Sequence, residues 1–415
     1  MPSSRARLAL LALGVAVCTN GPVFYLQFRV FDHPWDWTGP VVREAFIALS
    51  VASAASVALS VAQPGWWVAR RRAERVVIGI VSGFTLWIVA TSLWSVAPDI
   101  TRSRSIIYVG LACFAWLLAQ LRFEDLRRVL VLAIGALLVA SAAAVVLSDS
   151  IGWDDNDDWR GIFTNRNSLA PIAALGVILS IGLVIERRGR ARLGPAALGL
   201  LGAALMFGSG SRTAWLAMLC AIGLGSVIVL TRLGRDRFGS SATLLGGAAA
   251  VIGAIGAAVV VGSLWNESTF EQRRTIWGYI VDQIGERVWH GHGWFTIWTQ
   301  QDFTSQHYLL TRGSAHSSVH EVWLGAGLIG LVGFLAIVAF ALTNAGLDAW
   351  RRPGVATWTW LSIVAFLVIE NLTESFVLWF SYNWVLVMVA AFSVGSARPA
   401  RRDHRTPAPA EAVSV

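Results

Sequence analysis

The stretch VLVLAIGALLVASAAAVVL, residues 129–147, carries no charged side chain and is flanked by Arg127-Arg128 and Ser148-Asp149. As an α-helix, a run of this length covers the ~30 Å hydrocarbon core of a bilayer. Its apolar residues are continuous and do not alternate with polar ones, which favours a helix over a strand of a membrane barrel. The stretch therefore predicts a membrane-spanning helix.

Similar apolar runs recur along the chain, which is 55% apolar and only 14% charged. We predict an all-α polytopic membrane protein with about twelve spanning helices. Their ranges are 8–28, 41–62, 76–96, 105–121, 129–147, 168–185, 194–208, 213–231, 242–264, 323–346, 355–373 and 380–397. The first run lacks a small-residue cleavage site, so we expect a retained helix and not a signal peptide. Residues 1–397 should form a single membrane domain, and the Pro-, Ala- and Arg-rich residues 398–415 a disordered cytoplasmic tail.

The basic residues, all of them arginines, divide unequally between the two ends of the predicted helices. With the N-terminus in the cytoplasm, 22 of the 33 fall in cytoplasmic segments, which then carry a net charge of +14 against −6 outside. Short cytoplasmic loops of membrane proteins are enriched in basic residues in this way. We therefore expect both termini in the cytoplasm. The basic composition needs no nucleic acid to explain it, because cytoplasmic arginines contact anionic lipid.

The unusual polar residues gather on the predicted outer side, above all in the long loop 265–322. Apolar residues at 276, 277, 280, 281 and 284 have helical spacing, which predicts an amphipathic helix on the membrane surface. We expect the chemistry of the protein to lie in this loop. Charged residues are almost absent from the apolar runs, which argues against an ion-coupled transporter. The loop contains five of the seven histidines: His290, His292, His307, His316 and His320.

Arginines in two outer segments are candidate ligands for an anion. Arg212 follows Ser211 at the outer start of the predicted helix 213–231, after a run of glycine and serine. Small residues with exposed amide groups at a helix N-terminus bind anions, and a guanidinium adds a planar charged fork. Arg273 and Arg274 provide two more cations in the loop. Phosphate or pyrophosphate is the expected ligand, and the alternatives are a snorkelling arginine or general contact with lipid phosphate.

His316, His320 and Glu321 come just before the tenth predicted helix. If the segment is helical, the two histidines share a face with Glu321 alongside. An imidazole titrates near neutrality and can remove a proton from a sugar hydroxyl, while Glu321 could orient the ring or bind sugar. His316 is the candidate catalytic base, and a purely structural histidine is the alternative.

Metal ligation is a further alternative, because His290-x-His292 and His316-x-x-x-His320 are plausible ligand spacings. All three cysteines lie inside apolar runs, no HExxH pattern occurs, and glycines around 290–293 favour a turn, so we expect neither metal nor cofactor. The acidic run 154–158 lacks the closing glutamate of a calcium loop, which favours a solvated face. Beyond it, Asn167 and Ser168 either cap the next helix or bind sugar hydroxyls.

Taken in order, these segments resemble the O-antigen ligase and Wzy-type polymerase superfamily of bacterial surface-polysaccharide enzymes. No single motif is specific, but the ordered set covers most of the chain from the third predicted helix onward. The matching pieces are Leu93-Trp94-Ser95 with Asp99, Phe163 to Leu169, Ser211-Arg212-Thr213-Ala214, Arg273 with Trp277, Gly291-His292-Gly293, Ala315-His316 through Glu321, Gly327-Leu328-Ile329-Gly330, and Asn371 with Glu374-Ser375.

The resemblance implies a GT-C-like membrane glycosyltransferase on the outer face of the bacterial cytoplasmic membrane. Such an enzyme would transfer or polymerise an undecaprenyl-pyrophosphate-linked oligosaccharide, with inversion and without a metal, onto a glycan or lipid acceptor. In that family two arginines bind the donor pyrophosphate and a loop histidine acts as the base. The resemblance assigns these roles here to Arg212, Arg273 and His316.

The chain departs from the family pattern at three positions. Ser317 replaces a frequent asparagine, His320 a common leucine, and His292 the aromatic residue of a Gly-aromatic-Gly turn. The first two departures leave His320 as a second candidate for the base. Ligase and polymerase differ only in acceptor and are not distinguished. A transporter or flippase for a polysaccharide or lipid-linked glycan, and a non-catalytic export partner, are the alternatives from other classes. The sequence identifies neither the sugar nor the oligomeric state.

Overall fold

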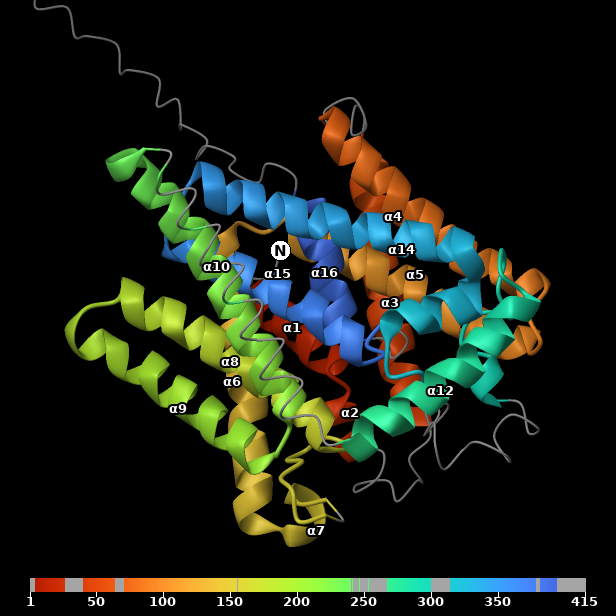
Figure 1. The fold of residues 1–415 in the computed structure, drawn as a ribbon, viewed down its shortest axis with the longest axis horizontal. Coiled ribbons are helices and arrows are strands. Elements are labelled where there is room, and N and C mark those ends of the chain that lie inside the picture. Colours follow the sequence, from red (N-terminus) through yellow and green to blue (C-terminus); the bar gives the residue numbers. More distant parts are fainter. Residues whose placement is uncertain are drawn as a thin grey trace, which may run out of the picture.

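A computed structural model describes residues 4–26, 40–63, 71–154, 156–239, 267–299, 314–377 and 381–393, with residues 241, 246 and 253 as isolated positions. Over these residues the chain is helical (Figure 1), apart from turns and an isolated β-bridge between Trp153 and Trp159. The all-α class predicted from the sequence is confirmed.

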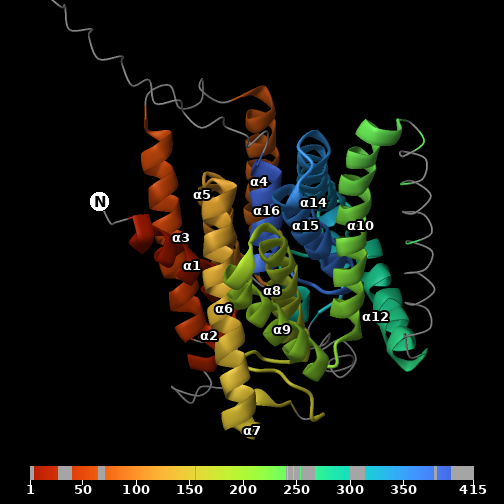
Figure 2. The ribbon, with the colours of Figure 1, turned by 90° about the vertical axis from the view of Figure 1, so that its left-hand side faces the viewer.

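The long helices run side by side, most of them roughly in one direction (Figure 2). Their bounds are α1 Ser4–Cys18, α3 Pro40–Val61, α4 Arg72–Ala90, α5 Pro98–Ala119, α6 Phe123–Leu147, α8 Arg166–Glu186, α9 Leu193–Gly208, α10 Arg212–Phe238, α14 Ser318–Arg351, α15 Val355–Thr373 and α16 Tyr382–Phe392. Elements at one end or edge of the bundle are α2 Gly21–Tyr25, α7 Asp149–Gly152 and α12 Glu267–Glu286. Helices distant in sequence pack together, since α10 contacts α15 and α5 contacts α16.

Within the described ranges, nine helices are long and apolar enough to cross a membrane. They correspond to nine of the twelve predicted runs. The first and last runs form the shorter helices α1, with 15 residues, and α16, with 11. The ninth run, 242–264, lies outside the described residues except for two positions, as does all of the predicted tail 398–415. The chain is a polytopic membrane protein, and the number twelve stays a prediction.

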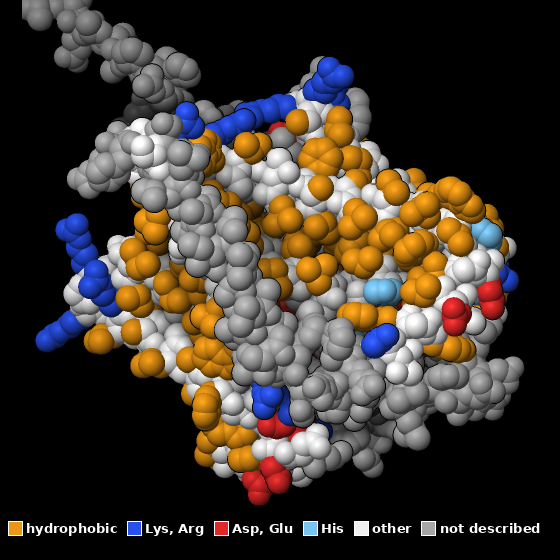
Figure 3. Space-filling view, in the orientation of Figure 1, with side chains coloured by type: hydrophobic (Ala, Val, Ile, Leu, Met, Phe, Trp, Pro, Cys, Tyr) orange, Lys and Arg blue, Asp and Glu red, His pale blue; other side chains and the backbone are white. Residues whose placement is uncertain are grey.

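Charged and apolar side chains occupy different parts of the surface (Figure 3). Arginines gather along the upper and left margins of that view and acidic residues at the lower and right margins, with a broad apolar surface between them. Among the exposed apolar side chains are Leu132 and Val139 of α6 and Ile329 and Val332 of α14. Leucine and valine exposed in this number on a helix bundle are suited to lipid, not water.

α14 is broken inside its apolar stretch, at Gly327, where φ is 68° and ψ is −172°. Essentially only glycine adopts this backbone conformation. A break of this kind frees N–H and C=O groups on both sides of it. Within a bilayer such groups must find partners in the protein, because no water is present to bind them.

The segment that follows α12 supplies most of these partners. This segment passes close to the break at Gly293, whose φ is 105°. Gly293 has no room for a Cβ, since that atom would lie 2.3 Å from Ser95 Oγ. The glycine-punctuated turn predicted around 290–293 is confirmed. Five hydrogen bonds satisfy the broken part of α14: His292 N to Leu324 O at 2.9 Å, Gly293 N to Gly325 O at 3.0 Å, Leu328 N to Val288 O at 2.8 Å, Ile329 N to Trp289 O at 3.4 Å, and Trp87 Nε1 to Ala326 O at 2.7 Å.

We predict that Gly327→Ala destabilises the protein by about 2 kcal/mol or more. The strained backbone costs roughly 1–3 kcal/mol for a non-glycine residue, and the new Cβ would lie 2.3 Å from the carbonyl carbon of Trp289. Thermal unfolding in detergent micelles measures the loss. Gly346→Ala, in the same helix with nothing within 4 Å of its Cβ, is the matched control and should be neutral or slightly stabilising. Equal melting temperatures for the two variants would contradict the prediction.

Candidate functional site

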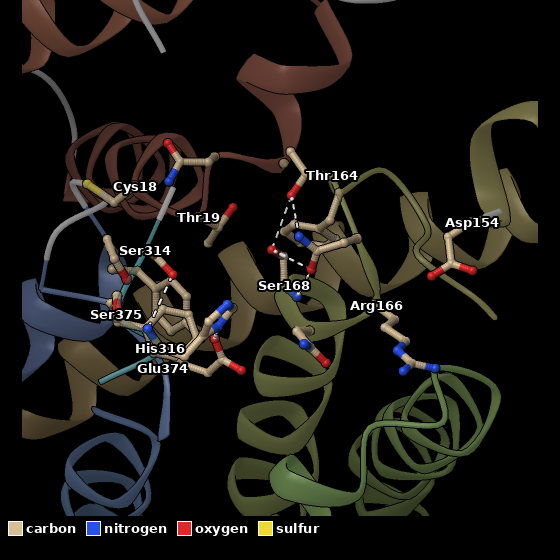
Figure 4. Close-up of a pocket in the computed structure, with 18 of the residues that line it drawn as sticks. Cys18, Thr19, Asp154, Thr164, Arg166, Ser168, Ser314, His316, Glu374 and Ser375 are labelled. Atoms are coloured by element: carbon tan, nitrogen blue, oxygen red, sulfur yellow. Dashed lines mark hydrogen bonds and ion pairs between the residues drawn. The ribbon is translucent and has the colours of Figure 1, made fainter. Parts of the chain in front are cut away.

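A polar cavity of about 790 Å³ opens at one end of the bundle. It is lined by residues from the α1–α2 turn, the segment before α8, the residues before α14, and the turn between α15 and α16. Figure 4 shows His316 and Glu374 on one side of it, Thr164 and Ser168 across from them, and Asp154 and Arg166 farther along the same rim. The cavity thus combines a titratable side with a neutral, hydroxyl-rich side.

His316 precedes α14, which begins at Ser318, and its φ of 48° lies outside the helical range. The expectation that His316 and His320 share a helix face is therefore wrong. The His316 N–H donates to Ser314 Oγ at 3.3 Å, and its ring Nδ1 lies 3.3 Å from Glu374 Oε2. The His316 and Glu374 side chains are 25% and 15% exposed, so both are sheltered yet reach the cavity.

A buried hydrogen-bond network fastens this segment to the ends of α15 and α16. Its members are Ser317 N to Ser375 Oγ at 3.1 Å, Ser318 Oγ to Asn371 Oδ1 at 2.6 Å, Val377 N to Ser318 Oγ at 3.2 Å, and a bond from Asn371 Nδ2 to Asn383 Oδ1. Buried polar groups that are satisfied in this way rigidify their surroundings. The network therefore fixes the backbone that carries His316.

Glu321 is 2% exposed and does not line the cavity. Its carboxyl oxygens accept hydrogen bonds from the N–H of Ala315, from Trp298 Nε1 at 2.9 Å and from Ser375 Oγ at 2.9 Å. All three partners are donors, which suits a carboxylate, since it has only acceptors. Glu321 thus holds Ala315, the residue before His316, and does not line the cavity where a ligand would bind.

His320 is likewise turned away from the cavity. Its ring stacks on Trp277 of α12, with centroids 5.2 Å apart and 9° between the planes, and its Nδ1 is buried without a hydrogen-bond partner in the described part of the chain. The Trp277 Nε1–H donates to the Ala315 carbonyl at 2.9 Å. The helix predicted in the loop is present as α12, and its Trp277 packs against the segment that carries His316; its place at the membrane surface stays a prediction.

The opposite side of the cavity begins with a helix cap. Asn165 Oδ1 accepts the N–H of Ser168 at 3.0 Å and so caps α8. Asn165, one of the residues quoted for the resemblance, is therefore the cap, whereas Asn167 is exposed and lines the cavity with its amide. Arg166 pairs with Asp158. The surface that Asn167 and its neighbours present is mostly uncharged, with amides and hydroxyls suited to sugar hydroxyl groups.

Arg212, one of the arginines predicted to bind pyrophosphate, is not among the described residues that line this cavity. Arg212 is the exposed first residue of α10, and Ser211 before it is buried. The preceding Gly210, with φ 61°, approaches the Asp158–Arg166 pair so closely that a Cβ would lie 2.7 Å from Asp158 Oδ1. Arg212 therefore lies two residues after Gly210, which packs against the Asp158–Arg166 pair at the edge of the cavity. Arg274 is exposed on α12, and the side chain of Arg273 is outside the described residues.

Several residues that line the cavity are not among the candidate site residues predicted from the sequence. The sequence indicates Glu374 only through the family resemblance, and the predicted span 8–28 includes the α1–α2 turn. The polar pair that ends this apolar run, Thr19-Asn20, was the available signal. No group of three histidines, cysteines or acids that could hold a metal occurs among the described residues. The residues that were missed are Thr19, Asn20, Thr164, Glu374, Ser381 and Tyr382.

The fold and the cavity together define a polytopic membrane protein with a polar pocket at one end of its helix bundle. Residues 196–335 match the O-antigen ligase family model. The chain is also 26% identical, over 303 residues, to an O-antigen ligase from Pseudomonas aeruginosa (strain PAO1), covering 70% of this chain and 69% of that protein. The resemblance to the O-antigen ligase and Wzy-type polymerase superfamily is thereby confirmed. It supports a membrane enzyme that ligates or polymerises glycans, with lipid and glycan as its partners.

We predict that Glu321→Gln destabilises the protein by about 1–3 kcal/mol. A glutamine amide has one acceptor oxygen, and its NH2 group can only donate. The NH2 group would therefore face one of the three donors that the carboxylate now accepts, and that buried donor would lose its hydrogen-bond partner. Differential scanning fluorimetry in detergent measures the effect. Asp282→Asn, exposed on α12, is the control and should shift stability by less than about 0.5 kcal/mol. A Glu321 variant as stable as this control would contradict the role described for the carboxylate.

We predict an acid-dependent loss of stability through His292, which is 5% exposed and has its Nε2 2.8 Å from the Gln283 carbonyl oxygen. Burial lowers the pKa of His292 below 6.5, and the charge of Arg287 adds to this, although the hydrogen bond to Gln283 opposes it. As pH falls below about 6.5, the unfolded chain binds a proton before the folded one does, so stability decreases.

The test is the change in melting temperature between pH 7.5 and 5.5 for the wild type and for His292→Phe. The variant should lose less stability on acidification, because the titrating ring is gone. His290→Phe removes an exposed histidine and should behave like the wild type. A wild type and a His292→Phe variant with parallel pH profiles would exclude His292 as the source.

Proposed function

We propose that the protein is an inverting, metal-independent glycosyltransferase whose donor is an undecaprenyl-pyrophosphate-linked oligosaccharide and whose acceptor is a glycan or lipid. The main observation in support is that His316 reaches a 790 Å³ polar cavity from one side while the hydroxyls of Thr164 and Ser168 face it from the other. A cavity of this size is in the range of small-molecule sites and accommodates the sugar units at a glycosidic junction.

In the proposed reaction His316 acts as general base. The acceptor hydroxyl oxygen forms a bond to the anomeric carbon while its proton passes to the imidazole, and the bond from that carbon to the pyrophosphate oxygen breaks. One displacement of this kind inverts the anomeric centre. The leaving pyrophosphate gains negative charge, which Arg212 and Arg273 would stabilise as fixed cations. Ser211 and Arg274 are proposed to support this anion site, and Asn167 to bind a sugar hydroxyl.

His316 is preferred to His320 as the base on geometric grounds. His320 is stacked on Trp277 and lies away from the cavity, whereas His316 lines it. A base must come within hydrogen-bond reach of the proton that it removes. Glu321 is proposed to act indirectly, by holding Ala315, and not by binding sugar.

We place the site on the outer face of the bacterial cytoplasmic membrane, with both termini in the cytoplasm. The cavity is lined by Asp154 and Asn156, which follow α7. α7 lies at one end of the bundle, and the arginine-rich start of α4 lies at the other (Figure 2). Arginine-rich ends face the cytoplasm in membrane proteins. We also propose that residues 1–397 form one membrane domain, since the cavity draws on helices from both ends of this range.

The proposal predicts that purified protein in nanodiscs releases undecaprenyl pyrophosphate and elongates or modifies an acceptor, with EDTA present. His316→Ala should lower the rate by about 10²–10⁴-fold, because general base catalysis is lost. Arg212→Ala and Arg273→Ala should lower it by about 10–10³-fold, as expected for lost charge stabilisation. Product size separates a ligase from a polymerase.

Matched controls remove the same residue types elsewhere. His290→Ala and Arg102→Ala alter an exposed histidine and an exposed arginine that do not line the cavity, and both should retain activity within about twofold. A wild-type rate in His316→Ala would overturn the assignment of the base. Activity that EDTA abolishes and a divalent cation restores would overturn metal independence. Undiminished transport of lipid-linked glycan without transfer would favour a flippase.

A further inference from the structure

We propose that Glu374 is a positioning residue for His316, accepting the Nδ1–H of its ring so that Nε2 is presented to the acceptor hydroxyl as a proton acceptor. This inference rests on the proposed function, since it concerns the same base. It adds a residue beyond the matched family region, which ends at residue 335. The observation that carries it is the 3.3 Å separation of His316 Nδ1 and Glu374 Oε2 at the cavity wall.

The two side chains meet because their backbones are fastened together independently of the ring. Ser317 N–H donates to Ser375 Oγ at 3.1 Å, and Ser318 Oγ lies 3.1 Å from the Glu374 carbonyl oxygen. These bonds use backbone atoms and serine hydroxyls and leave the Glu374 carboxylate out. A change to the Glu374 side chain therefore leaves the bonds that join the two segments intact.

The contact has a defined chemical consequence. A neutral imidazole carries one proton, and a carboxylate at Nδ1 favours the tautomer with the proton on Nδ1, which leaves a lone pair on Nε2. When Nε2 takes the proton of the acceptor hydroxyl, the ring becomes positively charged, and the nearby carboxylate stabilises that charge. Glu374 accepts the hydrogen bond throughout and exchanges no proton. A base oriented by a third group in this way is a recurring arrangement in nucleophilic catalysis.

The His316 ring lies outside the helix that follows it. Its φ of 48° and the start of α14 at Ser318 place the residue in the turn before the helix. Its ring is sheltered but reaches the cavity at 25% exposure. The carboxylate thus supplies the orientation that a helix would have provided.

The test compares Glu374→Gln and Glu374→Ala in the glycan-transfer assay. Glutamine keeps an oxygen that accepts the Nδ1–H but loses the charge, so kcat should fall by about 10-fold; alanine loses both, and kcat should fall by about 10²-fold. KM for the donor should change by less than about threefold in both, since the residue acts on the transition state. Asp282→Asn removes an exposed carboxylate on α12 that does not line the cavity and should leave kcat within about twofold.

A spectroscopic readout makes the result independent of turnover. In protein labelled with ¹⁵N-histidine, and assigned by difference with His316→Asn, the neutral His316 ring should carry its proton on Nδ1 in the wild type and in Glu374→Gln. In Glu374→Ala the population should shift to the tautomer protonated on Nε2. Rescue of the tautomer by glutamine but not by alanine distinguishes a hydrogen-bond acceptor from a residue needed only for folding.

Two outcomes overturn the inference: an unshifted tautomer in Glu374→Ala, or a loss of kcat in the Glu374 variants no larger than in Asp282→Asn. Failure of the proposed function has a different signature. If His316→Ala transfers glycan at the wild-type rate, His316 is not the base, and a Glu374-dependent tautomer would then describe a hydrogen bond with no catalytic role.

Discussion

The break in α14 at Gly327 is the constraint on which the rest of the structure depends. A bilayer contains no water to satisfy the freed backbone groups, so the protein must supply partners. The segment after α12 does so, with four backbone hydrogen bonds from residues 288–293. These bonds hold the segment that follows α12 against α14. Trp277 of α12 then reaches Ala315 and His320, and the outer loop is fixed to the start of the spanning helix.

The same physical logic explains how the cavity wall is held. The first turns of α14 and α16 and the last turn of α15 place Ser318, Asn383 and Asn371 in contact within the bundle, where each polar atom costs free energy unless it is paired. Glu321 adds a buried carboxylate with three donors around it. Such groups satisfy one another only in one arrangement, so the backbone that carries His316 has a single well-defined path.

The spanning helices could be predicted from the sequence because crossing a bilayer is a local requirement of length and apolar composition, as 129–147 illustrates.

The site could be predicted only in part. His316 was found because it is a titratable ring beside a membrane helix, yet its partner Glu374 lies 58 residues away, and no local pattern shows which acid will face the ring. The sequence places Glu321 beside the two histidines only if the helix includes His316. In the structure α14 begins two residues later, at Ser318, and the Glu321 side chain is buried. The predicted span 8–28 includes Thr19 and Asn20. Their polarity is visible in the sequence, but the sequence does not show that they line one cavity with residues 163–168.

The cavity is lined by Cys18 to Gly21, near one end of the chain, and by Ser381 and Tyr382, near the other. Ribosomes release a membrane protein from its N-terminus onward, and helices enter the bilayer as they emerge. The pocket therefore exists only after the last helix has been inserted. A nascent chain halted between His316 and α16 contains the histidine but lacks the part of the wall that Ser381 and Tyr382 complete. Polar surface that the finished molecule encloses therefore stays open until that helix has been inserted.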